Sequence, residues 1–416
     1  MKTIMTSFLV ILCLNLFAQT KEHLPAKVGM DGKVTGQIDN YFNKLVDENR
    51  IGGSVILMSK NGKVFHLKSY GWSDKEAVIP MTTNSIFNIA SMTKTFVNIS
   101  IMILKGQGLL SLDDPISKYI PEIGSMKVGI EYYDSLTNQN QLKLVDANKP
   151  ITIRHLLSHT SGFMSGWLYK GLIADQYNAT AKNNYSNLKD LVLAHSKIPL
   201  GHQPGTEWKY DFSTNVLAYL IEILSKKPLE DFFKEKILTP LKMNDTGYNL
   251  SEENITRVAK NYYVKNGQLI QSDWSGLADR VSLFTGTGGM WSTAEDYFKL
   301  CQMMLNKGEF NGVKILDSKS IDELFTDIEI GKDGNLFSWL PGYGFGLGFA
   351  VRVDNDKSNF SGSEGELCWF GVHNTAFWID RKEEIVGIEL THFPPDNLYQ
   401  FSKDLRNIVY SSLKER

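Results

Sequence analysis

The stretch FNIASMTKTFVNISIMIL, residues 87–104, decides the fold that this chain is expected to adopt. Its first residues, up to Ala90, are mostly apolar, and from Phe96 onward it is apolar almost all round, which is typical of a buried helix. Ser91 and Lys94 stand at the start of that helix, three residues apart and therefore on one face. The stretch predicts a buried helix whose first turn presents a hydroxyl beside an ammonium group.

The hydroxyl and ammonium of this first turn form a pair that can support nucleophilic catalysis. A serine hydroxyl is a poor nucleophile until a base removes its proton, and a lysine can be that base where burial or another cation favours the neutral amine. The free backbone N–H groups at a helix start also point toward an oxyanion that develops there. A helix cap next to a surface lysine is the alternative interpretation.

The same Ser-x-x-Lys pattern occurs twice more, and context separates the copies. Ser186 and Lys189 stand in an Asn-rich polar region, and Ser411 and Lys414 stand at the end of the last predicted helix. Neither pair leads into an apolar helix, so both are expected to be solvated surface.

Sheet-forming sequence is expected at both ends of the chain. Residues 54–60 and 64–72 predict two strands that Asn61-Gly62 joins in a tight hairpin turn. Helices are predicted over residues 36–50 and 397–415. Three or four further strands are predicted within residues 343–353, 365–372, 375–381 and 383–393.

The middle of the chain has helical periodicity interrupted by Gly and Pro. The expected fold is therefore α+β, an antiparallel sheet built from both termini and flanked by helices, with a mostly helical region inserted and a cleft at the junction. Polar residues 124–149 lack periodicity and are expected to form a long loop. We expect a single domain over residues 19–416, with sheet parts about 36–90 and 285–416 and a helical part about 91–284.

Composition and charge make nucleic acid an unexpected partner. The 416 residues are 42% hydrophobic and 22% charged, which is ordinary for a globular protein. The formal net charge is -2, so no excess of Lys and Arg is present to neutralise a phosphate backbone.

Residues 1–18 predict a secretory signal peptide. Lys2 precedes an apolar run over residues 8–17, and the small Ala18 follows before polar sequence begins. We therefore expect an exported protein, periplasmic or secreted. No later run approaches the ~18 apolar residues that would span a membrane, so no membrane span is expected in the mature chain.

The three cysteines suggest no disulfide. Cys13 lies inside the predicted signal and follows the bulky Leu12, which argues against lipid modification. Cys301 lies in an apolar helical stretch and Cys368 in a strand-like one, so two buried thiols are expected.

Five further blocks follow the Ser91 stretch in order: PITIRHLLSHTSGF (150–163), QPGTEWKYDFSTNVLAYLIE (203–222), TPLKMNDTGY (239–248), GTGGMWSTAEDYFKLCQMMLNKGEF (286–310) and GYGFGLGFAVR (342–352). Together with residues 87–122, they resemble the class C β-lactamase-like serine hydrolases. That superfamily also holds penicillin-binding proteins, D-amino-acid peptidases and family VIII carboxylesterases. The resemblance covers about residues 52–392 and implies the β-lactamase/transpeptidase-like fold.

The resemblance implies roles for three side chains. It makes Ser91 the acylated nucleophile and Lys94 its proton partner. Tyr210, in WKYDF, matches the family's second motif, where a tyrosine oxygen hydrogen-bonded to Lys exchanges protons with the nucleophile and the leaving group. The backbone N–H groups of Ser91 and Val372 would form the oxyanion hole.

The third motif departs from the usual family pattern. Lactamases and transpeptidases carry Lys, a small hydroxylated residue and Gly there, and the cation pairs with the substrate carboxylate. The matching substrate-binding residues here are Trp369, Phe370 and Gly371, of which Gly371 keeps the close backbone approach. The second motif has Phe212 where many members have an Asn that would hold an amide of the acyl chain. Both departures favour a neutral acyl ester held by an aromatic surface.

Three classes of function follow. A carboxylesterase that acts on small neutral acyl esters through an acyl-enzyme on Ser91 is favoured. A β-lactamase or a D-amino-acid peptidase or amidase is the alternative, which a Lys or His at position 369 would have favoured. A non-catalytic penicillin-binding-like module is disfavoured because the serine, lysine and tyrosine are all present. The expected partner is a small-molecule ester or amide, no cofactor is expected, and the oligomeric state is left open.

Other polar and glycine-rich residues receive structural interpretations. His155 and His159 are four apart on a predicted helix, which is zinc-ligand spacing, but no third ligand pattern accompanies them and no metal is expected. Residues 286–289 are interpreted as a turn because no Lys-Ser/Thr follows the glycines. His373 follows the predicted oxyanion strand, and the sequence leaves open whether it enters the cleft.

Overall fold

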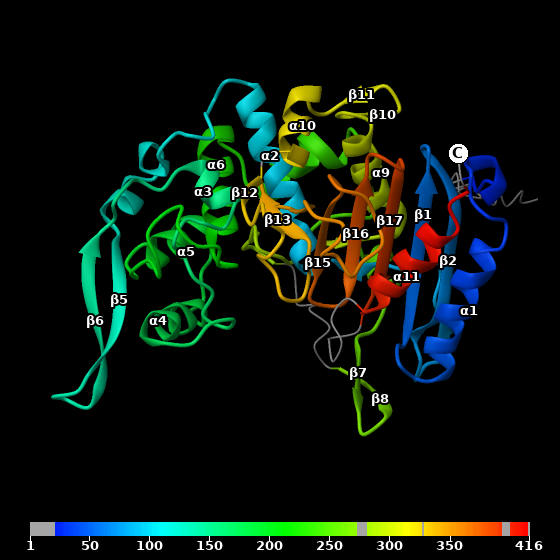
Figure 1. Ribbon diagram of the computed structural model, residues 1–416, viewed down its shortest axis with the longest axis horizontal. Coiled ribbons are helices and arrows are strands. Elements are labelled where there is room, and N and C mark those ends of the chain that lie inside the picture. The colour runs from blue at the N-terminus through cyan, green and yellow to red at the C-terminus, as the bar shows by residue number, and fades with distance from the viewer. Residues whose placement is uncertain (1–20, 273–280, 327, 393–399, 415–416) are drawn as a thin grey trace, which may run out of the picture.

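A nine-stranded antiparallel sheet occupies the right-hand part of the molecule in Figure 1. The computed structural model describes residues 21–272, 281–326, 328–392 and 400–414. In the sheet, β17 from the C-terminal part pairs with β1 from the N-terminal part, with Thr391 opposite Ser54. Strands from both ends of the chain thus form one sheet, which confirms the predicted α+β fold. In spatial order the strands are β12 (Ile328–Ile330), β13 (Tyr343–Gly346), β14 (Ala350–Arg352), β15 (Leu367–Gly371), β16 (Thr375–Asp380), β17 (Ile385–Thr391), β1 (Gly53–Lys60), β2 (Lys63–Asp74) and β3 (Ile79–Pro80).

The first hairpin of the sheet confirms the turn predicted at Asn61-Gly62. β1 and β2 run antiparallel on either side of it, with Lys60 opposite Lys63. Asn61 and Gly62 have positive φ angles of 53° and 69°. A two-residue turn with two positive φ angles matches the right-handed twist of the strands that it joins.

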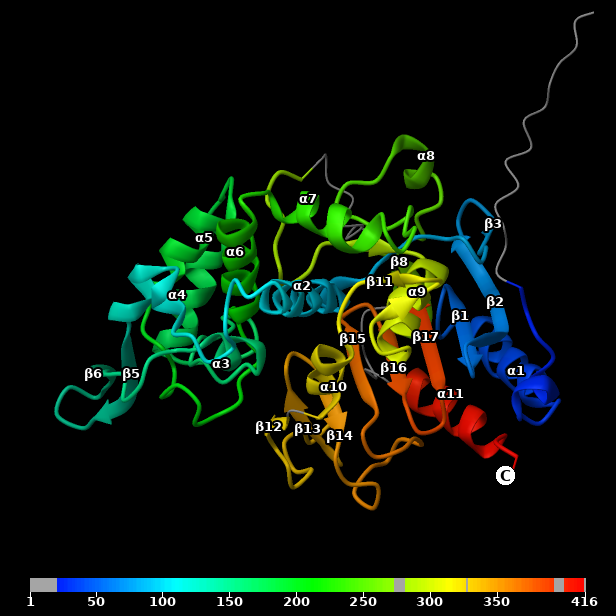
Figure 2. The ribbon, with the colours of Figure 1, turned by 90° about the horizontal axis from the view of Figure 1, so that it is seen from above.

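Helices cover both faces of the sheet (Figure 2). On one face α1 contacts α11 and β2, and on the other face α9 contacts β17, β1 and β16. The core-facing residues of α1 include Ile38, Phe42 and Leu45, which recur every three or four positions as an amphipathic helix requires. The bounds are α1 (Val34–Asp47), α9 (Ala294–Leu305), α10 (Ser318–Thr326) and α11 (Gln400–Ser411).

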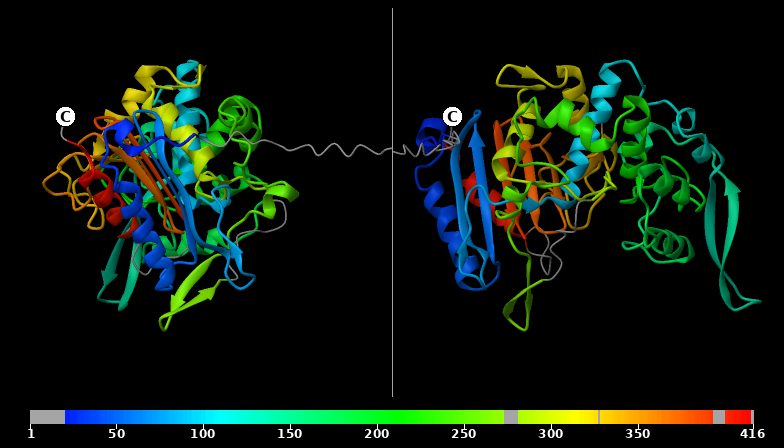
Figure 3. Two further views of the ribbon diagram at one scale, coloured as in Figure 1. Left: turned by 90° about the vertical axis from the view of Figure 1, so that its right-hand side faces the viewer. Right: turned by 180° about the vertical axis from the view of Figure 1, so that it is seen from behind.

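A mostly helical region lies beside the sheet (Figure 3). α2 joins the two parts, because it packs against α6 while the side-chain amide of Asn98 donates to the carbonyl oxygen of Gly348, at 3.1 Å, on the sheet side. The helices are α2 (Lys94–Gly106), α3 (Ile153–Leu157), α4 (Leu172–Ala181), α5 (Leu188–His195), α6 (Ser213–Ser225), α7 (Leu229–Phe233) and α8 (Glu252–Ile255). Small strand pairs are β4 (Phe87–Asn88) with β9 (Trp291–Ser292), β7 (Tyr262–Lys265) with β8 (Gln268–Gln271) and β10 (Glu309–Phe310) with β11 (Val313–Lys314).

The prediction of a long loop over residues 124–149 is wrong. β5 (Lys127–Asp134) and β6 (Gln139–Asp146) form a two-stranded hairpin that projects from the helical region (Figure 1). The Glu131 carboxylate accepts the backbone N–H of Ile173 (2.9 Å) at the start of α4. This contact with α4 is tertiary, and the largely polar sequence of the hairpin gives no local pattern that predicts it.

The predictions about the signal peptide, membrane spans and cysteines differ in whether the described residues test them. The predicted signal peptide, with Cys13, lies outside the described residues and stays a prediction. Among the described residues, no helix is long and apolar enough to cross a membrane. Cys301 and Cys368 are buried free thiols, as predicted, and burial raises the pKa of Cys368 to about 12.

One carboxyl group is buried in the sheet without a partner. Glu389 in β17 is 1% exposed, and neither of its carboxylate oxygens has a hydrogen-bond partner among the described residues. Burial raises the pKa of Glu389 to about 8, against the opposing attraction of the Arg406 charge. The folded protein therefore keeps this carboxyl group mostly neutral near neutral pH.

We expect Glu389→Gln to remove part of the pH dependence of folding stability. The pKa of this carboxyl in the folded chain is about 8, above the ordinary 4.5, so the folded state holds a proton that the unfolded chain releases. The stabilising effect of the neutral carboxyl is complete below about pH 4.5 and is lost as the pH rises toward 8. Urea denaturation at pH 5 and pH 8 should show a loss of roughly 1–3 kcal/mol in the wild type that Glu389→Gln lacks.

Glu364→Gln is the matched control, because Glu364 is exposed. That variant should lose as much stability between the two pH values as the wild type. An equal loss in Glu389→Gln would show that this buried carboxyl does not titrate in the measured range.

Candidate active site

Ser91 lies on a 3-10 turn that runs directly into α2. The turn spans Ala90–Thr93, and Lys94 is the first residue of α2. Residues i and i+3 eclipse each other in a 3-10 turn, which brings the two side chains together. Lys94 Nζ lies 3.2 Å from Ser91 Oγ, and the predicted hydroxyl–ammonium pair is therefore formed.

The residue before Ser91 has a strained backbone. Ala90 has a φ of 44°, which lies in the left-handed region that residues with a side chain rarely adopt. The Asn88 side chain holds it there by accepting the Ala90 N–H at 2.8 Å. The backbone N–H of Asn88 in turn donates to His392 Nε2 at 2.6 Å. The turn that carries the hydroxyl is thus fixed from the sheet side.

The glycine-rich turn 286–289 contacts Lys94 through the backbone of Thr287. Lys94 Nζ donates to the carbonyl oxygen of Thr287 at 2.6 Å. The backbone N–H of Thr287 donates to Asn215 Oδ1 at 3.3 Å, which ties the turn to α6. Sequence reasoning interpreted residues 286–289 only as a turn and missed this carbonyl, because only folding brings it to the lysine.

Tyr210 joins the pair from the segment just before α6. Lys94 Nζ lies 4.7 Å from the centroid of the Tyr210 ring. The Tyr210 hydroxyl is buried and has no hydrogen-bond partner among the described residues. The three side chains singled out from the sequence therefore meet, but the lysine faces the aromatic ring and not the phenol oxygen.

The end of β15 packs closely against the Ser91 turn. A Cβ atom on Gly371 would lie 2.7 Å from the carbonyl oxygen of Ile89 and 3.4 Å from Ala90 Cβ. Only glycine allows the strand to approach so closely. Val372, predicted to contribute an oxyanion N–H, is the first residue of the turn that follows β15.

The two aromatic residues of the third motif belong to an aromatic cluster. The Trp369 ring lies 5.5 Å from the Tyr210 ring and 5.3 Å from the Phe345 ring. The Phe370 ring lies 5.8 Å from the ring of the partly exposed Trp339. A buried indole thus stands beside the tyrosine.

A cavity of about 360 Å³ opens on Ser91. Lys94, Tyr210 and Phe212 also line it, together with residues of α4 and α5. The three third-motif residues do not appear among the described residues that line this cavity; Trp369 reaches the site through its ring contact with Tyr210.

His155 and His159, which have the sequence spacing of zinc ligands, have different partners in the structure. α3 ends at Leu157 and His159 has a φ of 54°, so they do not share a helix face as predicted. His155 Nδ1 accepts the backbone N–H of Thr152 at 3.2 Å as part of a helix cap. His159 Nδ1 lies 2.6 Å from Asp211 Oδ1, and its ring centroid is 4.9 Å from that of Tyr210.

The Asp211 carboxylate anchors the Tyr210 segment, a role that sequence reasoning missed. Besides His159, it accepts the Ser161 hydroxyl at 3.2 Å and the backbone N–H of Ser213 at 2.8 Å. These bonds join the HTSGF and KYDFS segments, which are about fifty residues apart. The aspartate beside the tyrosine and the histidine–serine run were the available signals, but nothing in the sequence pairs them.

The remaining candidates lie outside the Ser91 cavity. His373 is buried, and its ring lies 5.4 Å from that of His392. Burial lowers the pKa of His373 to about 4, so it is neutral at pH 7. The other two Ser-x-x-Lys pairs are exposed on the surface, as predicted.

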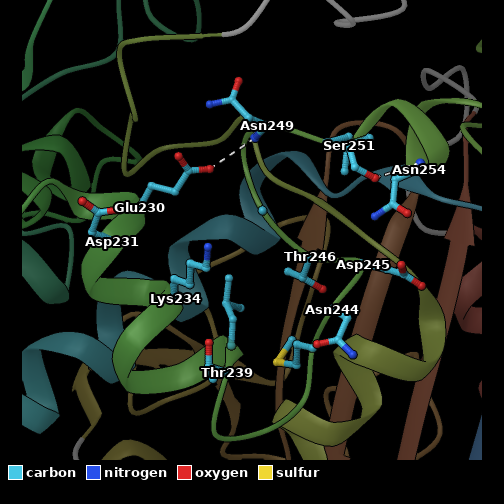
Figure 4. Close-up of a pocket in the computed structure, with 14 residues that line it drawn as sticks. Glu230, Asp231, Lys234, Thr239, Asn244, Asp245, Thr246, Asn249, Ser251 and Asn254 are labelled. Atoms are coloured by element: carbon cyan, nitrogen blue, oxygen red, sulfur yellow. Dashed lines mark hydrogen bonds between the residues drawn. The ribbon is translucent and has the colours of Figure 1, made fainter.

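A second pocket, of about 460 Å³, lies beside α7 (Figure 4). Among the described residues, none lines both this pocket and the Ser91 cavity. Glu230 Oε1 accepts the backbone N–H of Asn249 at 3.3 Å, and Ser251 Oγ accepts that of Asn254 at 3.1 Å. These contacts give the side chains of Glu230 and Ser251 structural roles.

Relatives of known sequence extend over most of the chain. An uncharacterized protein of Mycobacterium tuberculosis (strain CDC 1551 / Oshkosh) is 29% identical over 85% of this chain and 89% of its own length. Esterase EstB of Burkholderia gladioli is 25% identical over 93% of this chain and 98% of its own length.

Solved structures share the fold. EstCE1, described as a hydrolase with promiscuous acyltransferase activity, superimposes with a TM-score of 0.79 at 22% identity, over 91% of this chain and 98% of its own. Simvastatin synthase LovD from Aspergillus terreus has a TM-score of 0.77 at 20% identity, over 92% and 99% of the two chains. At these identities the likeness concerns the fold alone.

The family described as Beta-lactamase matches residues 38–407, which is most of the sequence. That range includes the sheet strands from both ends of the chain and the turn on which Ser91 meets Lys94. The chain therefore belongs to the beta-lactamase family of serine hydrolases.

Proposed function

We propose that this protein is a carboxylesterase that cleaves small neutral acyl esters through an acyl-enzyme on Ser91. The observation that carries the proposal is the 3.2 Å contact between Lys94 Nζ and Ser91 Oγ in a cavity beside an aromatic cluster. The 25% identity to a relative named as an esterase supports it.

In the first step, Lys94 removes the proton of Ser91. A neutral amine can donate an N–H to the carbonyl oxygen of Thr287 and keep its lone pair for the serine proton. Oγ then attacks the carbonyl carbon of the ester, and the carbonyl oxygen takes up the negative charge. The backbone N–H groups of Ser91 and Val372 would donate to that oxyanion.

In the second step, the intermediate collapses and the alcohol leaves. The bond to the alcohol oxygen breaks, and the Tyr210 hydroxyl, which has no other partner among the described residues, gives that oxygen a proton. The Lys94 ammonium, 4.7 Å from the ring centroid, stabilises the phenolate that remains. The lysine side chain then turns from the face of the ring to the phenol oxygen and returns the proton to it. Water then attacks the acyl-enzyme by the reverse proton transfers and restores Ser91.

The charge distribution of the cavity favours a neutral substrate. Among the described residues that line it, Lys94 is the only Lys or Arg. The hairpin of β5 and β6, which could have supplied another cation, does not contribute a described residue to the lining. An anionic substrate would lose its hydration without a matching charge, which costs several kcal/mol. Hydrolysis of β-lactams and D-amino-acid peptides is disfavoured for that reason.

Ser91→Ala should abolish ester hydrolysis and preserve the fold, because it removes the nucleophile and a single hydrogen bond. A fluorophosphonate probe should add its mass to the wild-type peptide that contains Ser91. Ser186→Ala is the matched control: it alters an exposed Ser-x-x-Lys pair and should retain activity and labelling. Labelling of another serine would refute the assignment.

Lys94→Ala and Tyr210→Phe should each lower kcat by about 10²- to 10⁴-fold, because each interrupts proton transfer to or from Ser91. The effects should be non-additive, as is usual for groups that act as one unit. Steady-state kinetics of the two variants and the double variant test this. A double variant whose loss equals the product of the single losses would show that the groups act independently.

The ratio of kcat/KM for p-nitrophenyl butyrate over nitrocefin should lie well above one. The physical reason is the absence of a free cation for the nitrocefin carboxylate among the described lining residues. The same ratio measured on Ser91→Ala corrects for background hydrolysis. A wild-type ratio below one would replace the esterase assignment by the lactamase one and leave the nucleophile assignment in place.

A further inference from the structure

We propose that the part of the Ser91 cavity between α4, α5 and α6 binds a compact apolar group of the substrate that carries a hydroxyl, and that His195 Nε2 accepts the hydrogen bond from it. The inference rests on the proposed esterase function and names its substrate class. The group belongs to the acyl chain or to the alcohol of the ester, and the two sources are separated by the experiment below.

Apolar and aromatic side chains make up part of the cavity lining. Its described lining includes Met164, Tyr177, Leu191 and Leu283, of which the first three are buried. Such a wall favours an alkyl group, because transfer of apolar surface out of water stabilises the complex. A cavity of about 360 Å³ is at the small end of the range for ligand pockets, so the group must be compact.

His195 is one of the polar residues in the lining of this cavity. It is the last residue of α5, is 1% exposed, and lines the cavity. Its Nδ1 lies 2.8 Å from the carbonyl oxygen of Leu191, and a carbonyl can only accept, so Nδ1 carries the proton. Burial lowers the pKa of His195, which favours the neutral ring. Nε2 is then an acceptor with a free lone pair.

Among the described residues no donor is bonded to that lone pair; the Tyr177 ring lies 5.7 Å from the His195 ring, and its hydroxyl is also unpaired. Nε2 makes no hydrogen bond to the described residues, and with Nδ1 bound to its own helix it is the polar atom that the ring can offer to the cavity. The nearby Tyr185 hydroxyl donates to the carbonyl oxygen of Thr180 at 3.0 Å. A ligand hydroxyl that enters the cavity would satisfy this acceptor.

Phe212 fixes the orientation of the histidine. The two rings are stacked with centroids 3.9 Å apart and an angle of 11° between their planes. Phe212 is two residues from Tyr210, so the histidine is supported from the same segment that carries the phenol. The aromatic residue at this position therefore has a function in the chain: it supports His195 where an Asn would bind an amide directly.

The class of substrate follows from the penalty for leaving the acceptor unpaired. A site built to bind a hydroxyl discriminates against an analogue of the same shape that lacks it, because the buried polar group then has no partner. We expect a preference of at least about tenfold in kcat/KM, expressed mainly in KM, for the hydroxylated ester of a matched pair.

Two sets of matched esters separate the two sources of the hydroxyl. The acyl set compares p-nitrophenyl butanoate with its 3-hydroxybutanoate and p-nitrophenyl hexanoate with its 6-hydroxyhexanoate. The alcohol set compares butyl acetate with 4-hydroxybutyl acetate, followed by release of acetate. The wild type should prefer the hydroxylated member in one set, and that set identifies the side of the ester that enters this end of the cavity.

His195→Phe keeps an aromatic ring against Phe212 and removes the acceptor, so the ratio between the paired esters should fall to about one. Tyr185→Phe is the matched control, because it removes a hydroxyl from the same cavity that is already bonded to Thr180. That variant should retain the wild-type ratio.

A wild type that hydrolyses the plain esters without preferring the hydroxylated ones in either set overturns this inference and leaves the esterase proposal in place. A wild type that hydrolyses none of the esters overturns both. A preference that persists in His195→Phe, or that Tyr185→Phe abolishes, overturns the assignment to His195. The wild-type comparison requires no variant, so the inference can be refuted even if His195→Phe does not fold.

Discussion

Lys94 is 4% exposed, and a polar group buried to that degree must find polar or aromatic partners inside the protein. It finds them in three separate parts of the chain: the Ser91 hydroxyl, the Thr287 carbonyl and the face of the Tyr210 ring. Because each partner comes from a different segment, the need to satisfy one buried group brings together the turn before α2, the glycine-rich turn before β9 and the segment before α6.

The sheet supplies the rigid side of this arrangement. β17 pairs with β1 and thereby joins the two ends of the chain, and β15 approaches the Ser91 turn so closely that only Gly371 fits. His392, just after β17, accepts the backbone N–H of Asn88, whose side chain holds the strained Ala90. The position of Ser91 is therefore set by contacts with the sheet, while the helical region contributes Tyr210 and most of the residues that line the cavity.

The charged groups that line the Ser91 cavity determine which substrates the cavity favours. Apart from Lys94 no Lys or Arg of the described residues lines the cavity, and Asp211 is bonded to His159 and to Ser213. The indole of Trp369 packs against Tyr210. A neutral substrate with apolar groups therefore loses the least free energy on leaving water.

Features that depend on neighbours in the sequence were predictable: the β1–β2 hairpin, the apolar face of α1, and the contact of Ser91 with Lys94, because turn chemistry, helical periodicity and an i, i+3 spacing are local. The aligned blocks of the family also placed Tyr210 near the nucleophile. The hydrogen bond from Lys94 to Thr287 joins residues 193 positions apart, and that between His159 and Asp211 joins residues 52 apart. The β5–β6 hairpin likewise contacts α4 through a hydrogen bond from Ile173 to Glu131. The orientation of the His195 ring depends on its stacking against Phe212. Only the tertiary structure decided these, because a contact between distant segments leaves no periodic pattern in either of them.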